Sequence, residues 1–242
     1  MGKPWRLILD QKNNGYYNMA VDKAICLSYP LKKIPTLRIY GWSKPFVTLG
    51  YNQKQQEVLN SDSAVPFTRR ITGGSSILHH QELTYSLTCS RDDLKLPSKI
   101  KELYKVLCSF LIYFYSHLGL KADFAQDIFS SGLGRYSNFC FSSYEHFDLV
   151  INKKKIGGNA QRHRRDVIFQ QGSIPQEIDF DLIRRTINNP GNLEDKTISL
   201  NTLLSKKTDF NKLSLILAES FQKVFKVEFT PLEASLFNGV YA

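Results

Sequence analysis

Apolar and polar residues change their spacing several times along the chain, and each spacing predicts a different kind of element. Alternating residues predict strands, the first of them at a sheet edge, over residues 5–9, 36–40, 46–50, 67–71, 83–88, 147–151, 158–161, 167–174 and 227–229. Helical spacing predicts helices over residues 18–28, with Asn18 as the N-cap, and over 53–59, 100–118, 180–186 and 213–225. Because the strands and helices are interspersed, the pattern predicts a mixed α/β, or α+β, fold.

The length of the chain suits one large domain without a membrane span. Its 242 residues, 42% of them hydrophobic, are enough to bury a substantial core. The longest apolar stretch, residues 106–115, is interrupted by Ser109 and is about half of the roughly 20 residues that a span requires. The first residues do not resemble a secretory signal, so we expect a cytoplasmic protein with no membrane partner.

The net charge and the spacing of the cysteines restrict the partners and the kinds of site that we expect. A formal net charge of +10 favours acidic partners, which include nucleic acid, a membrane surface and an acidic protein. The four cysteines, at positions 26, 89, 108 and 140, form no C-x-x-C pair, so we expect neither a metal site nor a disulfide framework. Free thiols in a reducing compartment fit this spacing.

A glycine-bearing segment after a predicted strand is the first candidate site. It reads Arg69-Arg70-Ile71-Thr72-Gly73-Gly74-Ser75-Ser76-Ile77-Leu78-His79. Two glycines in a turn let the backbone approach a ligand closely with its N–H groups facing outward, and the arginines supply charge for a phosphate or carboxylate. A plain hairpin with solvated arginines would have the same residues, so both interpretations stay open.

Two further segments carry reactive side chains. In residues 153–161 a basic run, in a turn expected at residues 152–155, meets Gly157 and Gly158, and such a segment is more often a solvated hairpin tip than a site. In residues 138–141, Cys140 lies between two phenylalanines. A lone cysteine is usually a small core residue, and Cys140 differs only if a nearby cation favours its thiolate.

Taken together, these segments resemble the lipoate-protein ligase and octanoyltransferase superfamily. Residues 69–79 look like its R-R-x-[ST]-G-G-x-x-x-x-H loop, residues 82–86 resemble the strand that follows, and residues 155–161 resemble its lysine motif K-[IV]-x-G-[NS]-A-Q. Further similar segments are residues 18–22, 37–42, 49–53 and 172–174. The resemblance covers residues 5–175 and weakens beyond them.

The resemblance implies a largely antiparallel α+β catalytic domain related to biotin-protein ligases. We expect it to be a single domain over residues 1–242, with its core motifs in 5–175 and no separate C-terminal accessory domain. The resemblance also implies an apolar acyl tunnel under the glycine loop. Acyl- or nucleotide-binding positions would be Arg70, Gly73, Gly74, Ser75, Ser76, Ile77, Leu78, His79, Gly157, Gly158, Asn159 and Ala160. In one departure, Ser75 replaces the third glycine of many ligases, and its side chain would crowd a bound adenylate.

Cys140 resembles the nucleophile of the cysteine-dependent octanoyltransferases, which lies fifteen residues before the motif lysine, as Cys140 lies before Lys155. The resemblance thus implies two steps. Lys155 lowers the pKa of Cys140, whose thiolate takes an octanoyl or lipoyl group from an acyl carrier protein. The acyl group then passes to a lysine of a lipoyl-domain protein, such as a 2-oxoacid dehydrogenase E2 subunit or the glycine cleavage H protein. Amides of the glycine loop or of the Gly157-Gly158 turn would hold the oxyanion.

Three alternatives remain at this point. A lipoate-protein ligase would use ATP and Mg²⁺, form a lipoyl-adenylate beside Lys155 and leave Cys140 as a packing residue. A lipoyl amidotransferase would use the same cysteine with a lipoylated protein as donor. A nucleic-acid-binding relative of biotin ligases would explain the charge, but the sequence shows no helix-turn-helix extension. A basic face around residues 153–155 and 162–165, facing acidic carrier proteins, explains it without nucleic acid. The transferase needs no permanently bound cofactor and no metal.

Overall fold

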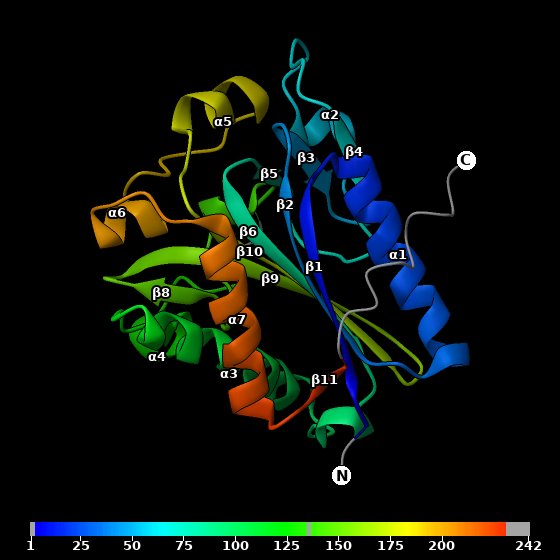
Figure 1. The fold of residues 1–242 in the computed structure, drawn as a ribbon. Helices are drawn as coiled ribbons and strands as arrows, with labels where there is room; N and C mark the ends of the chain where they lie inside the picture. The colour runs from blue at the N-terminus through cyan, green and yellow to red at the C-terminus, as the bar shows by residue number, and fades with distance from the viewer. Residues whose placement is uncertain (1–2, 135–136, 231–242) are drawn as a thin grey trace.

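The computed structural model describes residues 3–134 and 137–230, in which one large sheet separates two sets of helices (Figure 1). The strands of this sheet follow the order β11-β1-β2-β6-β10-β9-β8-β7. Their bounds are β1 (Trp5–Asn13), β2 (Thr36–Trp42), β6 (Glu82–Cys89), β7 (Asp123–Phe124), β8 (Leu149–Ile151), β9 (Lys154–Arg164), β10 (Val167–Pro175) and β11 (Phe229–Thr230). Only β1 pairs in parallel, with β2 and with β11, among these described strands.

A second, smaller sheet has the order β4-β3-β5. It consists of β3 (Phe46–Leu49), β4 (Phe67–Arg69) and β5 (Ile77–His79), with β3 parallel to β4 and antiparallel to β5. The helices are α1 (Gly15–Lys32), α2 (Gln55–Val58), α3 (Ile100–His117), α4 (Ala125–Ile128), α5 (Phe180–Thr186), α6 (Leu200–Leu204) and α7 (Phe210–Phe225), with 3₁₀ turns η1 (Asp92–Leu94) and η2 (Cys140–Ser142). The expected mixed and largely antiparallel α+β fold is confirmed.

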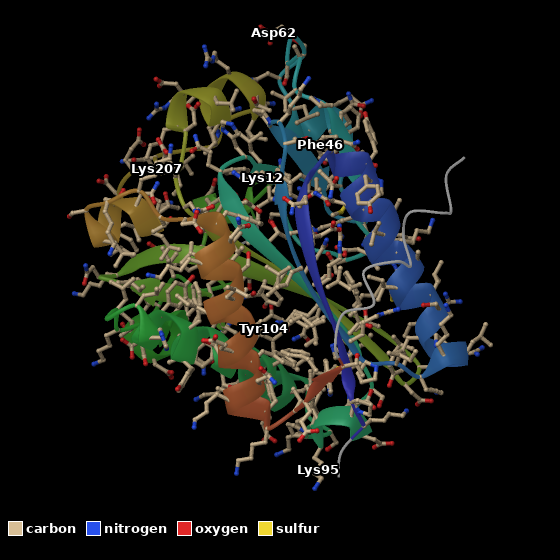
Figure 2. All side chains as sticks on the ribbon, viewed as in Figure 1. Lys12, Phe46, Asp62, Lys95, Tyr104 and Lys207 are labelled. Atoms are coloured by element: carbon tan, nitrogen blue, oxygen red, sulfur yellow. The ribbon has the colours of Figure 1, made fainter. Side chains whose placement is uncertain are left out.

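One face of the large sheet forms an apolar core with α3 and α7. The buried residues of α3 recur every three or four positions, as in Leu103, Leu107, Phe110 and Phe114, because this spacing returns to the same side of a helix. Burying each such side chain contributes about 1.5–3 kcal/mol. Figure 2 shows the side chains filling the space between these helices and the sheet. This face therefore holds the fold together.

The opposite face is polar and receives α1. Arg38 of β2 is fully buried, and its Nη1 and Nη2 lie 2.8 Å from carboxylate oxygens of Asp22 and Asp10. The hydroxyl of Tyr40 also donates to Asp22, at 2.8 Å. A buried charge is tolerated only with such partners, so this network fastens α1 to the sheet at one position.

Two local predictions are wrong. Strand β1 is not at the sheet edge, because β11 pairs with it at Trp5 and Arg6. The N-cap of α1 is Asn14, whose side chain accepts the Tyr17 amide. Asn18 lies one turn inside the helix, fully buried, and its Nδ2 donates to the Gly41 carbonyl at 3.0 Å. Asparagine is common at helix N-caps, but Asn18 instead bonds to a residue of β2 that is distant in the sequence.

Within the described ranges, every helix is too short or too polar to serve as a membrane span.

Candidate active site

A cavity of about 160 Å³ lies where β9 and β10 meet the small sheet, the glycine loop and η2. The structure brings most of the predicted site residues to its wall, namely Arg70, Gly74, Ser75, Ile77, His79, Cys140, Lys155, Gly158, Asn159 and Ala160. Gly73, Ser76, Leu78 and Gly157 do not line it. Thr48 and Gln171 add polar wall positions that the sequence did not single out, and Thr84 and Ser173 add two from the similar segments 82–86 and 172–174.

The glycine loop is folded by close backbone packing and by Arg70. Gly74 has a φ of +83°, a conformation that favours glycine, and a Cβ on Gly50 would lie 1.8 Å from the Gly74 carbonyl oxygen. Arg70 Nη2 donates to the carbonyl oxygens of Gly73 and Ser75, each at 2.7 Å, and its Nη1 donates to the Thr48 carbonyl at 3.1 Å. Burial lowers the pKa of Arg70 to about 10. Arg70 therefore organises the loop, and its donors are already engaged by the protein.

The loop is joined to the segment that carries Cys140. The Ser75 hydroxyl donates to the Ser137 carbonyl, and the Ser76 hydroxyl donates to the Asn138 carbonyl at 2.6 Å. The Cys140 amide in turn donates to the Ser76 carbonyl at 2.8 Å. Among the described residues, the amides of Gly74 and Ser75 have no protein acceptor. Because both residues line the cavity, their amides are candidates for holding a developing oxyanion.

Cys140 and Lys155 meet at the cavity wall, as the sequence predicted. The Lys155 ammonium lies 3.5 Å from Cys140 Sγ and also donates to the carbonyl oxygens of Cys140, at 2.8 Å, and Ser143, at 3.2 Å. Only 1% of Lys155 is exposed. A cation is thus held beside the sulfur by contacts that fix its position.

Asp148 is a buried partner of Lys155 that the sequence motifs did not reveal. Its Oδ2 lies 2.5 Å from Lys155 Nζ, and only 5% of the residue is exposed. Burial opposes the charge of Lys155, but Asp148 and Cys140 together outweigh the burial and raise the pKa of Lys155 above its ordinary range. The signal was present, since a buried lysine needs a counter-ion and Asp148 directly precedes an apolar strand.

The net shift of the Cys140 pKa differs from the expectation. Burial raises the pKa of the Cys140 thiol above its ordinary value, and Asp148 adds to this effect. Lys155 and Arg70 lower the pKa of Cys140, but they do not outweigh the burial. Lys155 therefore lowers the pKa of Cys140 as predicted, but burial outweighs this effect and leaves the pKa above its ordinary value.

Lys155 and Gly157 lie in a strand instead of a turn, whereas Gly158 lies in a strand as predicted. Asn152 and Lys153, with φ values of 51° and 62°, make the tight connection from β8, and β9 begins at Lys154. Gly157 and Gly158 therefore form no turn that could hold an oxyanion. Gly157 is required for packing, because a Cβ there would lie 2.3 Å from the Ser173 carbonyl oxygen.

Gly158 leaves room for the sulfur. A Cβ at this position would lie 2.7 Å from Cys140 Sγ. We expect Gly158→Ala to reduce acylation of Cys140 by at least about tenfold, because even a misplacement of the nucleophile that costs about 1.4 kcal/mol has that effect. The melting temperature should change much less, since η2 can shift slightly. Quenched time courses measure the acylation rate, and thermal unfolding measures the melting temperature. Full activity of the variant would contradict this role of Gly158.

His79 supports the wall of the cavity. Its Nδ1 lies 2.8 Å from Glu82 Oε1, its Nε2 lies 2.8 Å from Thr48 Oγ1, and its ring stacks on Trp42 at 3.9 Å between centroids. Burial lowers the pKa of His79. With both ring nitrogens engaged, His79 holds β3, β5 and β6 together. Within residues 3–134 and 137–230, no group of three or more potential metal ligands is found.

Known proteins resemble this chain over nearly its full length. The chain is 32% identical over 245 residues to the octanoyltransferase LipM of Brevibacillus brevis, covering 94% of this chain and 89% of that protein. It is 30% identical to the octanoyltransferase LipM of Bacillus subtilis, and the match covers 96% of this chain and 90% of that protein.

Solved structures share the fold at lower identity. A lipoate-protein ligase A bound with ATP aligns with a TM-score of 0.79 at 20% identity, covering 95% of this chain and 88% of that one. A bi-partite lipoate protein ligase from Thermoplasma acidophilum, solved with its E2 lipoyl domain, aligns with a TM-score of 0.75 at 19% identity, covering 95% and 87%. A family model of the lipoyl protein ligase A/B catalytic domain matches residues 14–222. The chain belongs to the lipoyl protein ligase A/B catalytic domain family.

Proposed function

We propose that the protein transfers an octanoyl group from an acyl-carrier thioester, through a thioester on Cys140, to a lysine of a lipoyl-domain protein. The observation that carries the proposal is the Lys155 ammonium, fixed 3.5 Å from Cys140 Sγ in a cavity of acyl-chain scale. The octanoyltransferase names of relatives that match over nearly the full chain support it.

The first step exchanges one thioester for another. Cys140 Sγ forms a bond to the octanoyl carbon as the carrier's C–S bond breaks, and the thiol proton of Cys140 passes to the departing carrier thiolate. Lys155 stabilises the Cys140 thiolate as the proton leaves. The free amides of Gly74 and Ser75 are the candidates for holding the oxyanion, and removing one such donor typically costs about 100 to 1,000-fold in rate.

The second step forms the amide. The neutral ε-amine of the acceptor lysine attacks the acyl-enzyme carbon, the bond to Cys140 Sγ breaks, and the thiol is restored as the nitrogen loses a proton. Neither step needs ATP or Mg²⁺. A ligase reaction would instead begin with ATP and a free acid, and would not need a thiol at the position that Cys140 holds.

Intact-mass measurement tests the proposal. Purified protein incubated with an octanoyl-acyl carrier protein, without ATP, should gain one octanoyl group that hydroxylamine removes, because thioesters are cleaved by this reagent. Addition of a lipoyl domain should discharge the adduct onto the domain. No adduct, together with lipoate- and ATP-dependent labelling of the lipoyl domain, would establish the ligase reaction instead. Discharge of a lipoylated domain as the sole donor would establish an amidotransferase.

A further inference from the structure

Arg162 connects β9 to the glycine loop beside the cavity that contains Cys140. Gly158, Ala160 and Arg162 alternate along β9, so their side positions face the same side of the sheet. Gly158 and Ala160 line the cavity. Arg162 is the next position on this face, and its Nη1 donates to the carbonyl oxygen of Ile71 at 2.8 Å. The side chain therefore reaches from one side of the cavity to the segment that begins the other.

A second contact holds the Arg162 side chain in this place. Its guanidinium lies over the ring of Tyr51, 4.9 Å from the ring centroid, which is an attractive arrangement for a cation. The Tyr51 amide donates to the carbonyl of Thr72 at 2.9 Å. Arg162 thus contacts the chain on both sides of this hydrogen bond, at Tyr51 and at Ile71. It grips the glycine loop where the loop leaves the small sheet.

The loop has little else to hold it against β9. Within residues 3–134 and 137–230, the bond from Arg162 is the only hydrogen bond between residues 71–76 and β9. Arg70 holds the carbonyl oxygens of Gly73 and Ser75 from within the loop and does not reach β9. Glycine residues leave the backbone unusually free, so the loop does not fix its own position. The position of the loop relative to β9 therefore depends on Arg162.

This position matters because the reacting groups are divided between the loop and β9. The loop carries the amides of Gly74 and Ser75, which are the candidates for holding the oxyanion. β9 carries Lys155, whose Nζ lies 3.5 Å from Cys140 Sγ. Oxyanion donors act only within hydrogen-bond distance of the atom that becomes charged, and a shift of about 1 Å is enough to lose much of their effect.

The next basic residue on the same face differs from Arg162. Arg164 follows at the same spacing along β9, but it is exposed, and its side chain makes no hydrogen bond or ion pair with the described residues. Arg162 is half-buried and has two partners. A solvated basic run would treat the two arginines alike, so the contacts of Arg162 indicate a specific role.

We propose that Arg162 is a positioning residue, which clamps the glycine loop against β9 and so keeps the Gly74 and Ser75 amides aligned with the acyl carbonyl. This inference rests on the proposed function, because that carbonyl is the one that Cys140 attacks. Arg162 does not line the cavity and acts through the loop that it holds.

The test compares Arg162→Met with Arg164→Met as the matched control. Methionine keeps an apolar stem but can neither donate a hydrogen bond nor carry a charge. The donors are octanoyl-acyl carrier protein and octanoyl-N-acetylcysteamine, a small uncharged thioester that needs no protein docking. Intact mass gives the rate of acyl-enzyme formation at several donor concentrations. Hydrogen exchange of the Tyr51 amide, which is bonded to Thr72, reports the loop without any reaction.

Arg162→Met should lower the acylation rate by about tenfold or more with both donors, because a misplacement of about 1 Å can cost up to about 100-fold. With the carrier protein, the maximum rate should fall while the half-saturating concentration changes less than about twofold. The Tyr51 amide should exchange faster, and the melting temperature should change little, because both contacts of Arg162 lie near the surface. Arg164→Met should keep the original rate and exchange.

An unchanged rate in Arg162→Met, or an equal loss in Arg164→Met, would overturn the proposal. A loss confined to the carrier-protein donor, with a raised half-saturating concentration, would also overturn it and would assign Arg162 to docking of that protein. Failure of the proposed function would look different, because the unaltered protein would then form no thioester with either donor, whereas hydrogen exchange would still report whether Arg162 holds the loop.

Discussion

Cys140→Ser should slow octanoyl transfer by about three orders of magnitude or more and abolish the hydroxylamine-labile adduct. Serine keeps the shape of the side chain, but its hydroxyl is a far weaker acid than a thiol. Lys155 cannot remove the hydroxyl proton, because Asp148 stabilises its charged form. The measurements are the rate of acyl transfer to a lipoyl domain and the intact mass after incubation with the donor.

The matched control is Cys26→Ser. Cys26 is also half-buried, but it lies on α1 and does not line the cavity. This variant should transfer at the original rate and keep the adduct. If Cys140→Ser retained transfer within about tenfold of the original, the sulfur would not be the nucleophile, and the covalent mechanism would be wrong.

Removing one member of the Lys155–Asp148 pair should destabilise the protein far more than removing both. Lys155→Met leaves the Asp148 carboxylate buried without its cation, and Asp148→Asn leaves the ammonium without its anion. Breaking such a pair typically costs about 3–5 kcal/mol, whereas replacing both charges is often close to neutral. The double variant should therefore regain most of the stability while acylating Cys140 far more slowly at neutral pH, because no cation remains beside Cys140.

Urea unfolding of the two single variants and the double variant measures this difference, and acyl-enzyme formation measures the activity. A double variant as unstable as the sum of the singles would show that the two charges do not act as a pair. A double variant that acylates Cys140 at the original rate would show that Lys155 is not needed for acylation.

A further readout is the pH at which acylation reaches half its maximum. The pKa of Cys140 is raised by burial and lowered by Lys155, so the rate should rise with pH in the original protein and rise at higher pH when the lysine is replaced.

The motif residues were predictable because their chemistry is local. Gly74 is needed where the chain takes a positive φ, and the order of the loop, cysteine and lysine segments identified them before any contact was known. The helix of residues 100–118 was also predictable, since the apolar residues on one side of it are the ones that it buries.

Side-chain partners far apart in sequence were not predictable in the same way. Asn18 was taken for a cap, yet its amide bonds to Gly41 on another strand. The first strand was placed at an edge, because the strand that covers it, at Phe229 and Thr230, lies near the other end of the chain. Residue type restricts what a side chain can bind, but only the fold decides which partner it meets.

By itself, the sequence determined the superfamily, the mixed fold and the two side chains, Cys140 and Lys155, that meet at the cavity. Only the tertiary structure decided that Asp148 forms an ion pair with Lys155, that Arg70 uses its hydrogen bonds on the glycine loop, and that burial raises the pKa of Cys140. The physical reason is that motifs specify which groups are present, whereas charge balance and pKa depend on burial and on neighbours that come together only when the sheets pack.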